Sequence, residues 1–165
     1  MISPLELLKD LEQENLFLDW KKQNPENFLS HFFTPLSSDF RIKANWEVGF
    51  FNKEKITVFV PIENGFAIKP ADDVFKKPDA KVEKLVLKDV KLTFEEALEV
   101  FKKNLPDKFP NEQLGDGFII LQTYQGKTLW NFTFITKKLK FVNLKINSLS
   151  GNVEDSQEID LVQKS

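Results

Sequence analysis

Residues 93–105 read TFEEALEVFKKNL, and three apolar stretches follow: GFIILQTY (117–124), TLWNFTFIT (128–136) and KFVNLKINSLSGNV (140–153). Thr93 is a candidate helix N-cap, and Glu96, three residues later, completes a capping box. Pro106 and Pro110 predict the end of this helix. The helix would bury the residues that recur at helical spacing, which are Phe94, Ala97, Leu98, Phe101 and Leu105. This stretch predicts one helix followed by three strands.

The later stretches alternate between apolar and polar residues. Trp130, Phe132 and Phe134 share one side, and so do Val142, Leu144 and Ile146. Such a period of two predicts an antiparallel sheet with one covered face, and the helix at 93–105 is the expected cover. The first strand is predicted at 118–124, after a turn at Gly115-Asp116-Gly117. The end of the chain, around Ile159 to Val162, either adds an edge strand or frays.

The first half of the chain also begins with a capped helix, at Ser3-Pro4-Leu5-Glu6. Its apolar side is formed by Leu7, Leu8, Leu11, Phe17, Leu18 and Trp20. Asn24-Pro25 interrupts this helix, and a second short helix is predicted up to Thr34-Pro35. That second helix would pack through Phe28, Leu29, Phe32 and Phe33.

A hairpin is predicted from Trp46 to Val60, with its turn at 52–55 and a short third strand at 66–68 after Asn64-Gly65. Residues 69–80 are predicted to form a polar connection, and Val82, Leu85 and Leu87 a further strand. The hairpin is apolar on both faces. Phe51 and Phe59 lie opposite a second set, which is Trp46, Val48, Phe50, Ile56, Val58 and Val60. One of these two apolar faces is expected to be buried against the other half of the chain or against a second copy of the protein, or to bind a partner.

The two halves share an order of elements, which favours an α+β fold in which helices pack on antiparallel meander sheets. We expect an N-terminal helix-plus-hairpin unit at 1–80 and a helix-plus-three-strand unit at 81–165, together forming one compact structure. Residues 46–64 correspond in pattern to residues 118–137. The shared order suggests duplication, with the two sheets joined edge to edge or packed face to face.

Composition excludes several classes of protein. The 165 residues carry a net charge of −2, too little to attract nucleic acid or an anionic membrane over a distance. The absence of cysteine excludes disulfides and thiolate chemistry. Seventeen Phe and three Trp residues supply a large core. No apolar run is long enough to span a bilayer. A cytoplasmic location is expected if residue 1 is the natural start, and an extracytoplasmic one if a leader was removed.

Candidate reactive residues are few. His31 is the single histidine and lies in an aromatic patch, so a structural or surface role is favoured. Asp72-Asp73 is interpreted as a solvated turn, because adjacent carboxylates give too few oxygens for Ca²⁺. The remaining polar candidates are Glu47, Glu95, Asp116 and Tyr124. None is paired with a base at suggestive spacing, and we predict no catalytic, cofactor-binding or metal-binding residue.

One cluster combines basic and aromatic residues: Lys137, Lys138, Lys140, Phe141 and Lys145. A nucleic-acid site would need such a cluster, yet alternating lysines on a strand more simply form a solvated face. No nucleic-acid partner is predicted.

The segment from residue 90 to 154 resembles a PepSY domain. That family has a start of the type "s-x-eeA" and an ending of the type "yvDa-x-tGev", which match residues 93–97 and 145–153. Asn147 stands where the family usually has Asp. The resemblance implies a non-catalytic role in inhibiting or chaperoning peptidases and in regulation at the cell envelope.

The sequence therefore favours a non-catalytic binding or regulatory module with a protein or peptide partner, in which a homodimer is one arrangement. Two alternatives stay open. One is a small-ligand-binding domain with an aromatic pocket, and the other is a minor enzyme on a curved, cystatin-like sheet.

Overall fold

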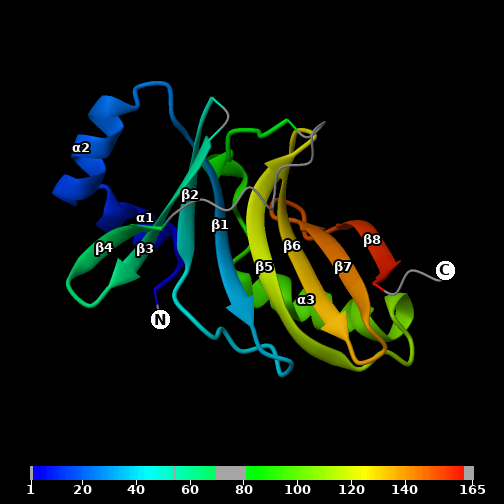
Figure 1. Cartoon of the computed structure of the whole chain (residues 1–165). Helices are drawn as coiled ribbons and strands as arrows, with labels where there is room; N and C mark the ends of the chain where they lie inside the picture. The colour runs from blue at the N-terminus through cyan, green and yellow to red at the C-terminus, as the bar shows by residue number, and fades with distance from the viewer. Residues whose placement is uncertain (1, 54, 70–80, 162–165) are drawn as a thin grey trace.

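A computed structural model describes residues 2–53, 55–69 and 81–161. It contains one eight-stranded antiparallel sheet in the order β4-β3-β2-β1-β5-β6-β7-β8, with helices packed on one face (Figure 1). The α+β class with an antiparallel sheet is thus confirmed. The helices are α1 (Pro4–Leu11), α2 (Asn15–Gln23) and α3 (Phe94–Lys108). The strands are β1 (Phe28–Leu36), β2 (Glu47–Asn52), β3 (Lys55–Ile62), β4 (Gly65–Lys69), β5 (Leu114–Tyr124), β6 (Lys127–Thr136), β7 (Lys140–Asn147) and β8 (Val153–Asp160).

The two halves of the chain join edge to edge through β1 and β5. Residues 31–36 of β1 pair with residues 117–122 of β5, so the four strands of each half continue into a single sheet. The alternative of two sheets packed face to face is not the arrangement found. By position in the sheet, the hairpin β2–β3 corresponds to β6–β7, and not to the β5–β6 pair that the sequence pattern suggested.

Both predicted capping boxes are present. The Ser3 Oγ accepts a hydrogen bond from the Glu6 backbone N–H at 3.3 Å, and the Thr93 Oγ1 accepts one from the Glu96 N–H at 3.1 Å. The helix that begins at Thr93 was predicted to end at Pro106. This was wrong, because α3 continues to Lys108. A proline so close to the end removes only one intrahelical hydrogen bond, which packing of the helix readily offsets.

The core lies between the helices and one face of the sheet. Phe101 of α3 stacks on Phe132 and Phe134 of β6, with ring centroids 4.7 and 5.3 Å away. Phe17 of α2 packs against Phe50 and Phe59 with centroids 5.1 and 5.4 Å away. Each fully buried aromatic side chain contributes about 1.5–3 kcal/mol, so these clusters fix the helices on the sheet.

The prediction of a helix over residues 28–33 was wrong, because this segment is β1. The register of β1 shifts between Leu29 and His31, and both Leu29 and Ser30 are buried. This bulge breaks the period of two and leaves apolar residues at 28, 29, 32 and 33, a spacing that imitates a helix. The long first helix was also wrong, since α1 ends at Leu11 and α2 begins at Asn15.

The predicted faces of the β2–β3 hairpin also need correction. Val48 pairs with Phe59, and Phe51 pairs with Ile56. Paired residues project from the same side of a sheet. Phe59 therefore joins the core, while Ile56, Val58 and Val60 share the opposite face with Phe51. The short turn between Asn52 and Lys55 sets this register, which the sequence pattern alone did not resolve.

Three further segments test the sequence interpretation. Residues 81–86 form no strand, and Leu87–Asp89 form a 3-10 turn, η2. Gly115 to Gly117 lie within β5 and not in a turn, although the pairing shifts register there. The predicted short strand β4 is present. Of the two alternatives for the end of the chain the structure has the edge strand, β8, but it spans Val153–Asp160 and thus begins earlier than the expected stretch around Ile159 to Val162.

The connection predicted at 69–80, which includes Asp72-Asp73, lies outside the described residues apart from its first position. Among the helices that the structure describes, none is long and apolar enough to cross a membrane.

Candidate binding groove on the open face of the sheet

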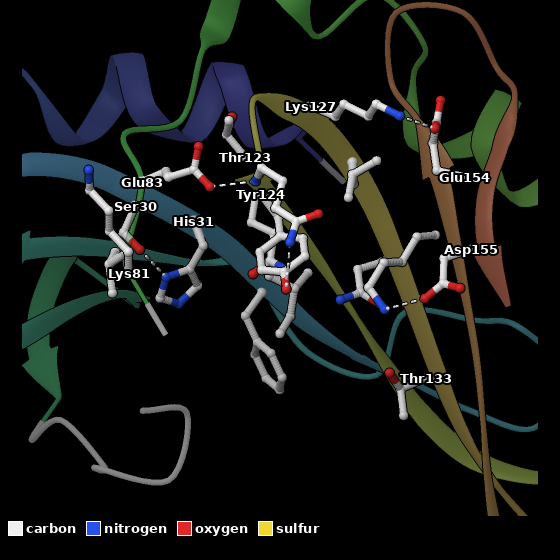
Figure 2. A pocket seen from close by; sticks show the side chains of 18 of the residues that line it. Ser30, His31, Lys81, Glu83, Thr123, Tyr124, Lys127, Thr133, Glu154 and Asp155 are labelled. Carbon is white, nitrogen blue, oxygen red and sulfur yellow. Dashed lines mark hydrogen bonds and ion pairs between the residues drawn. The ribbon is translucent and has the colours of Figure 1, made fainter. Parts of the chain in front are cut away.

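The sheet has a second face, opposite the helices, which we call the open face. A groove of about 670 Å³ runs along it, lined by residues of β1, β3 and β5 to β8 (Figure 2). Residues 81–83 form one end of the groove. The strands contribute mainly Ser30, His31, Phe33, Ile56, Phe118, Ile120, Gln122, Tyr124, Lys127, Leu129, Asn131, Thr133, Lys145, Glu154, Asp155 and Gln157.

The floor of the groove lies where the two halves of the chain join. Phe33 pairs with Ile120, and Pro35 pairs with Phe118, across the β1–β5 ladder. The rings of Phe33 and Phe118 lie 5.6 Å apart. Ile120 and both phenylalanines are half-buried, so this part of the floor is apolar.

A hydrogen-bonded network forms the wall on β6, β7 and β8. The Asn143 side-chain amide donates to the Thr133 hydroxyl at 2.9 Å and also to the Asn131 side chain. The Lys145 Nζ donates to the Asn143 Oδ1 at 2.7 Å and lies 3.5 Å from the Asp155 carboxylate. These contacts link three strands and hold the polar side chains in fixed positions.

A second ion pair lies at the start of β8. The Lys127 Nζ is 2.6 Å from the Glu154 carboxylate, which also accepts a hydrogen bond from the Asn147 amide at 3.1 Å. The Lys127 hydrogen bond, followed by the one from Asn147, holds the pKa of Glu154 below its usual value. The groove thus carries lysines and carboxylates that are already matched to one another.

Glu83 fixes the segment that forms the end of the groove. Its carboxylate accepts hydrogen bonds from the backbone N–H groups of Gln125 and Gly126, in the β5–β6 turn. Two residues later, the Leu85 N–H donates to the Leu29 carbonyl at 2.9 Å. The segment is therefore bound both to the β5–β6 turn and to β1.

His31 lies at the side of the groove, next to the strand β2. An ideal Cβ built on Gly49 would lie 2.1 Å from the His31 Cε1, so the imidazole occupies the space that a side chain at residue 49 would need. The Ser30 hydroxyl lies 3.1 Å from the His31 Nδ1. Burial lowers the pKa of His31 to about 4, and the ring is neutral at pH 7.

The other candidate residues are not brought together. Glu47 pairs with Lys69 at 3.0 Å, and Asp116 pairs with Lys43 at 2.8 Å. Glu95 lies in the first turn of α3, on the other side of the sheet, and Tyr124 lines the groove. Within residues 2–53, 55–69 and 81–161 no group of three or more metal-ligating side chains is found.

Two lysines of the basic cluster near β7 have carboxylate partners. Lys140 lies 3.6 Å from Glu112 and 3.9 Å from Glu158, while Lys145 faces Asp155. These pairs reduce the positive charge that a phosphate backbone would meet.

The groove itself was missed by sequence reasoning, because β1 was interpreted as a helix. Burial alternates along residues 31–36, but the residues themselves, HFFTPL, do not alternate between polar and apolar, so no local signal located this strand.

Comparison with known proteins adds information on the fold. A crystal structure of a putative lipoprotein from Clostridium difficile 630 is similar, with a TM-score of 0.50 and 14% sequence identity. The similarity covers 90% of this chain and 97% of that one. At this identity it shows a shared fold and nothing about activity. No protein-family model and no curated protein matches the sequence, so the PepSY resemblance stays a prediction.

Proposed function

We propose that this protein is a non-catalytic binding module that holds a segment of a protein partner in the open-face groove. The observation that supports the proposal is the groove itself, of about 670 Å³, which crosses the join between the two halves. Its floor offers Phe33, Phe118 and Ile120, and Tyr124 is 44% exposed at its side. Partly exposed aromatic anchors surrounded by polar groups are typical of protein interfaces.

The charges in the groove favour a partner segment without a strong net charge. Lys127 and Lys145 are matched by Glu154 and Asp155, so neither sign dominates. Side-chain amides such as that of Gln122 can donate and accept hydrogen bonds, as an extended backbone requires. A segment that places apolar side chains on the floor and its backbone against these amides fits this arrangement.

The PepSY resemblance supports a peptidase as the class of partner, and the module would then regulate it.

The order of elements that the two halves of the chain share supports an origin by duplication. Each half supplies a capped helix and a four-stranded meander, with the helix α2 between them in the first half. Trp46 and Trp130, near the start of β2 and in β6, lie 6.0 Å apart beside the join.

For localisation, we propose the extracytoplasmic option. The shared fold with a protein described as a putative lipoprotein supports it. Fractionation of the source cells with an antibody to this chain tests it. Recovery in the cytosolic fraction alone would contradict it.

The groove is tested by a matched pair of charge substitutions. Tyr124→Arg puts a cation into the groove, and Leu18→Arg puts one on α2, at a residue that is similarly exposed (44% and 42%). Each protein serves as bait in source-cell extract, and captured proteins are then purified and titrated. We expect a partner that binds the natural protein and Leu18→Arg equally and binds Tyr124→Arg at least about tenfold more weakly, a change of about 1.4 kcal/mol.

Two results would contradict this proposal. Equal binding of the partner to both variants would place its site elsewhere. Sedimentation showing that the natural protein is a dimer, and that Tyr124→Arg alone dissociates it, would assign the groove to a second copy of this chain.

A further inference from the structure

A second, smaller pocket lies on the helical side of the sheet, away from the groove. It has a volume of about 250 Å³ and lies between the first turns of α1 and α3. Residues 90–92 lie along it, and Leu121 of β5 contributes from the sheet. An apolar cavity of about 150 Å³ can hold one benzene molecule, so this pocket has room for a ring with a short substituent.

Three aromatic side chains in its lining contact one another. The rings of Trp46 and Phe94 lie 5.8 Å apart, and the Trp130 ring lies 6.0 Å from Trp46 and 6.3 Å from Phe94. Trp46 and Trp130 are only 2% and 1% exposed, and Phe94 is 9% exposed. Because the three rings hold one another in edge-on contacts, this part of the lining is formed before any ligand arrives.

Most polar groups around the pocket already have partners. The Trp130 indole N–H donates to the Leu92 carbonyl at 3.1 Å. The Ser3 and Thr93 hydroxyls cap their own helices. These groups therefore do not need a ligand.

The Trp46 indole is different. It lines the same pocket and its side chain is almost fully buried, and no hydrogen bond from its N–H to a described residue is found. In the described part of the chain its Nε1 is not among the fully buried atoms that lack a partner, so the N–H keeps access to water, which an acceptor on a ligand in the pocket would replace.

The charges at the pocket do not favour a charged ligand. Lys91 and Glu95 both line it and oppose each other in sign. The carboxylates of Glu6 and Glu96 already occupy the capping boxes at the two helix starts. The Glu95 carboxylate in the lining opposes an anion and Lys91 opposes a cation, while a neutral molecule loses little on leaving water.

We propose that this pocket binds a small uncharged aromatic molecule that carries one hydrogen-bond acceptor, such as an aryl ketone. The ring packs against Trp46, Phe94 and Trp130, and the acceptor oxygen accepts the hydrogen bond from the Trp46 N–H. This site is separate from the open-face groove and does not depend on the function proposed for it.

Titration of the full chain with three probes tests the site. Acetophenone has a ring and an acceptor, ethylbenzene has nearly the same shape without the acceptor, and benzoate is charged. The readout is the ¹H–¹⁵N resonance of each indole, assigned with Trp46→Phe and Trp20→Phe. We expect saturable shifts of the Trp46 indole with acetophenone, weaker binding of ethylbenzene by about three- to tenfold, and no binding of benzoate.

The variants supply the control. Trp46→Phe keeps an aromatic ring and removes the donor, so acetophenone should bind about three- to tenfold more weakly while ethylbenzene is unaffected. Trp20→Phe, outside the pocket lining, should leave both affinities unchanged. If acetophenone does not shift the Trp46 indole resonance of the natural protein, the proposal is overturned, whatever the affinities of the variants are. Equal affinity for acetophenone and ethylbenzene would overturn the role of the indole.

Discussion

The imidazole of His31 lies over Gly49 on the neighbouring strand, where an ideal Cβ would come within 2.1 Å of its Cε1. The two residues are partners in the β1–β2 ladder, immediately after the β1 bulge. Glycine at residue 49 thus leaves room for a side chain from another strand, and its own backbone conformation is not a special one.

Gly49→Ala should therefore destabilise the protein. The added methyl group must displace the imidazole, and overpacking of this kind typically costs about 1–3 kcal/mol. Urea denaturation of the natural protein and the variant measures the loss. The same substitution in a His31→Ala background should cost less than about 1 kcal/mol, because the clash is then absent. An equal cost in both backgrounds would contradict the steric explanation.

His31 should make stability depend on pH in a defined window. Its pKa is lowered to about 4 in the folded protein, against about 6.5 for an unfolded chain. The unfolded state therefore binds more protons between these values, so stability is fully present above pH 6.5 and falls as the pH drops toward 4. The loss should reach about 2–3 kcal/mol.

Denaturation curves from pH 7.5 to 4 for the natural protein and His31→Gln check this prediction. The carboxylates, which titrate at lower pH, affect both proteins alike. The difference in their free energies of unfolding at each pH therefore gives the contribution of His31. A parallel pH dependence of the two proteins would show that the His31 ring is not responsible.

The α3 capping box should be worth about 1 kcal/mol. Thr93→Ala removes the acceptor of the Glu96 N–H, whose hydrogen bond measures 3.1 Å, and a helix generally loses about 0.5–2 kcal/mol in this way. Thr93→Ser keeps the hydroxyl and should lose only a few tenths of a kcal/mol. Thermal and urea denaturation of the two variants provide the measurement, and equal losses would exclude the cap as the cause.

Glu83 should protect the β5–β6 turn. Its carboxylate accepts hydrogen bonds from the Gln125 and Gly126 N–H groups. In Glu83→Gln one neutral oxygen replaces the carboxylate, so both amides should exchange with solvent several-fold faster. Amide exchange followed by NMR gives the rates. Lys84→Gln is the control, and faster exchange in that variant too would indicate a general loosening of the segment.

The sequence by itself determined the features that depend on neighbours along the chain. The capping boxes at Ser3 and Thr93 need only residues three positions apart, and the alternation in β6 and β7 needs only a constant period. The tight turn at Asn64-Gly65 was also predicted from its dipeptide, and Gly65 has the positive φ that such a turn requires. In these places local chemistry and the final fold agree, so the pattern alone predicts the structure.

Tertiary structure alone decided the features that form the two proposed binding sites. The bulge at Leu29–His31 hides the period of β1, and only pairing with β2 and β5 makes this segment a strand. The join of β1 with β5 then places Phe33 beside Phe118, although 85 residues separate them in the chain. The groove and the aromatic pocket both arise at this join, because their walls come from strands and helices whose proximity no local pattern encodes.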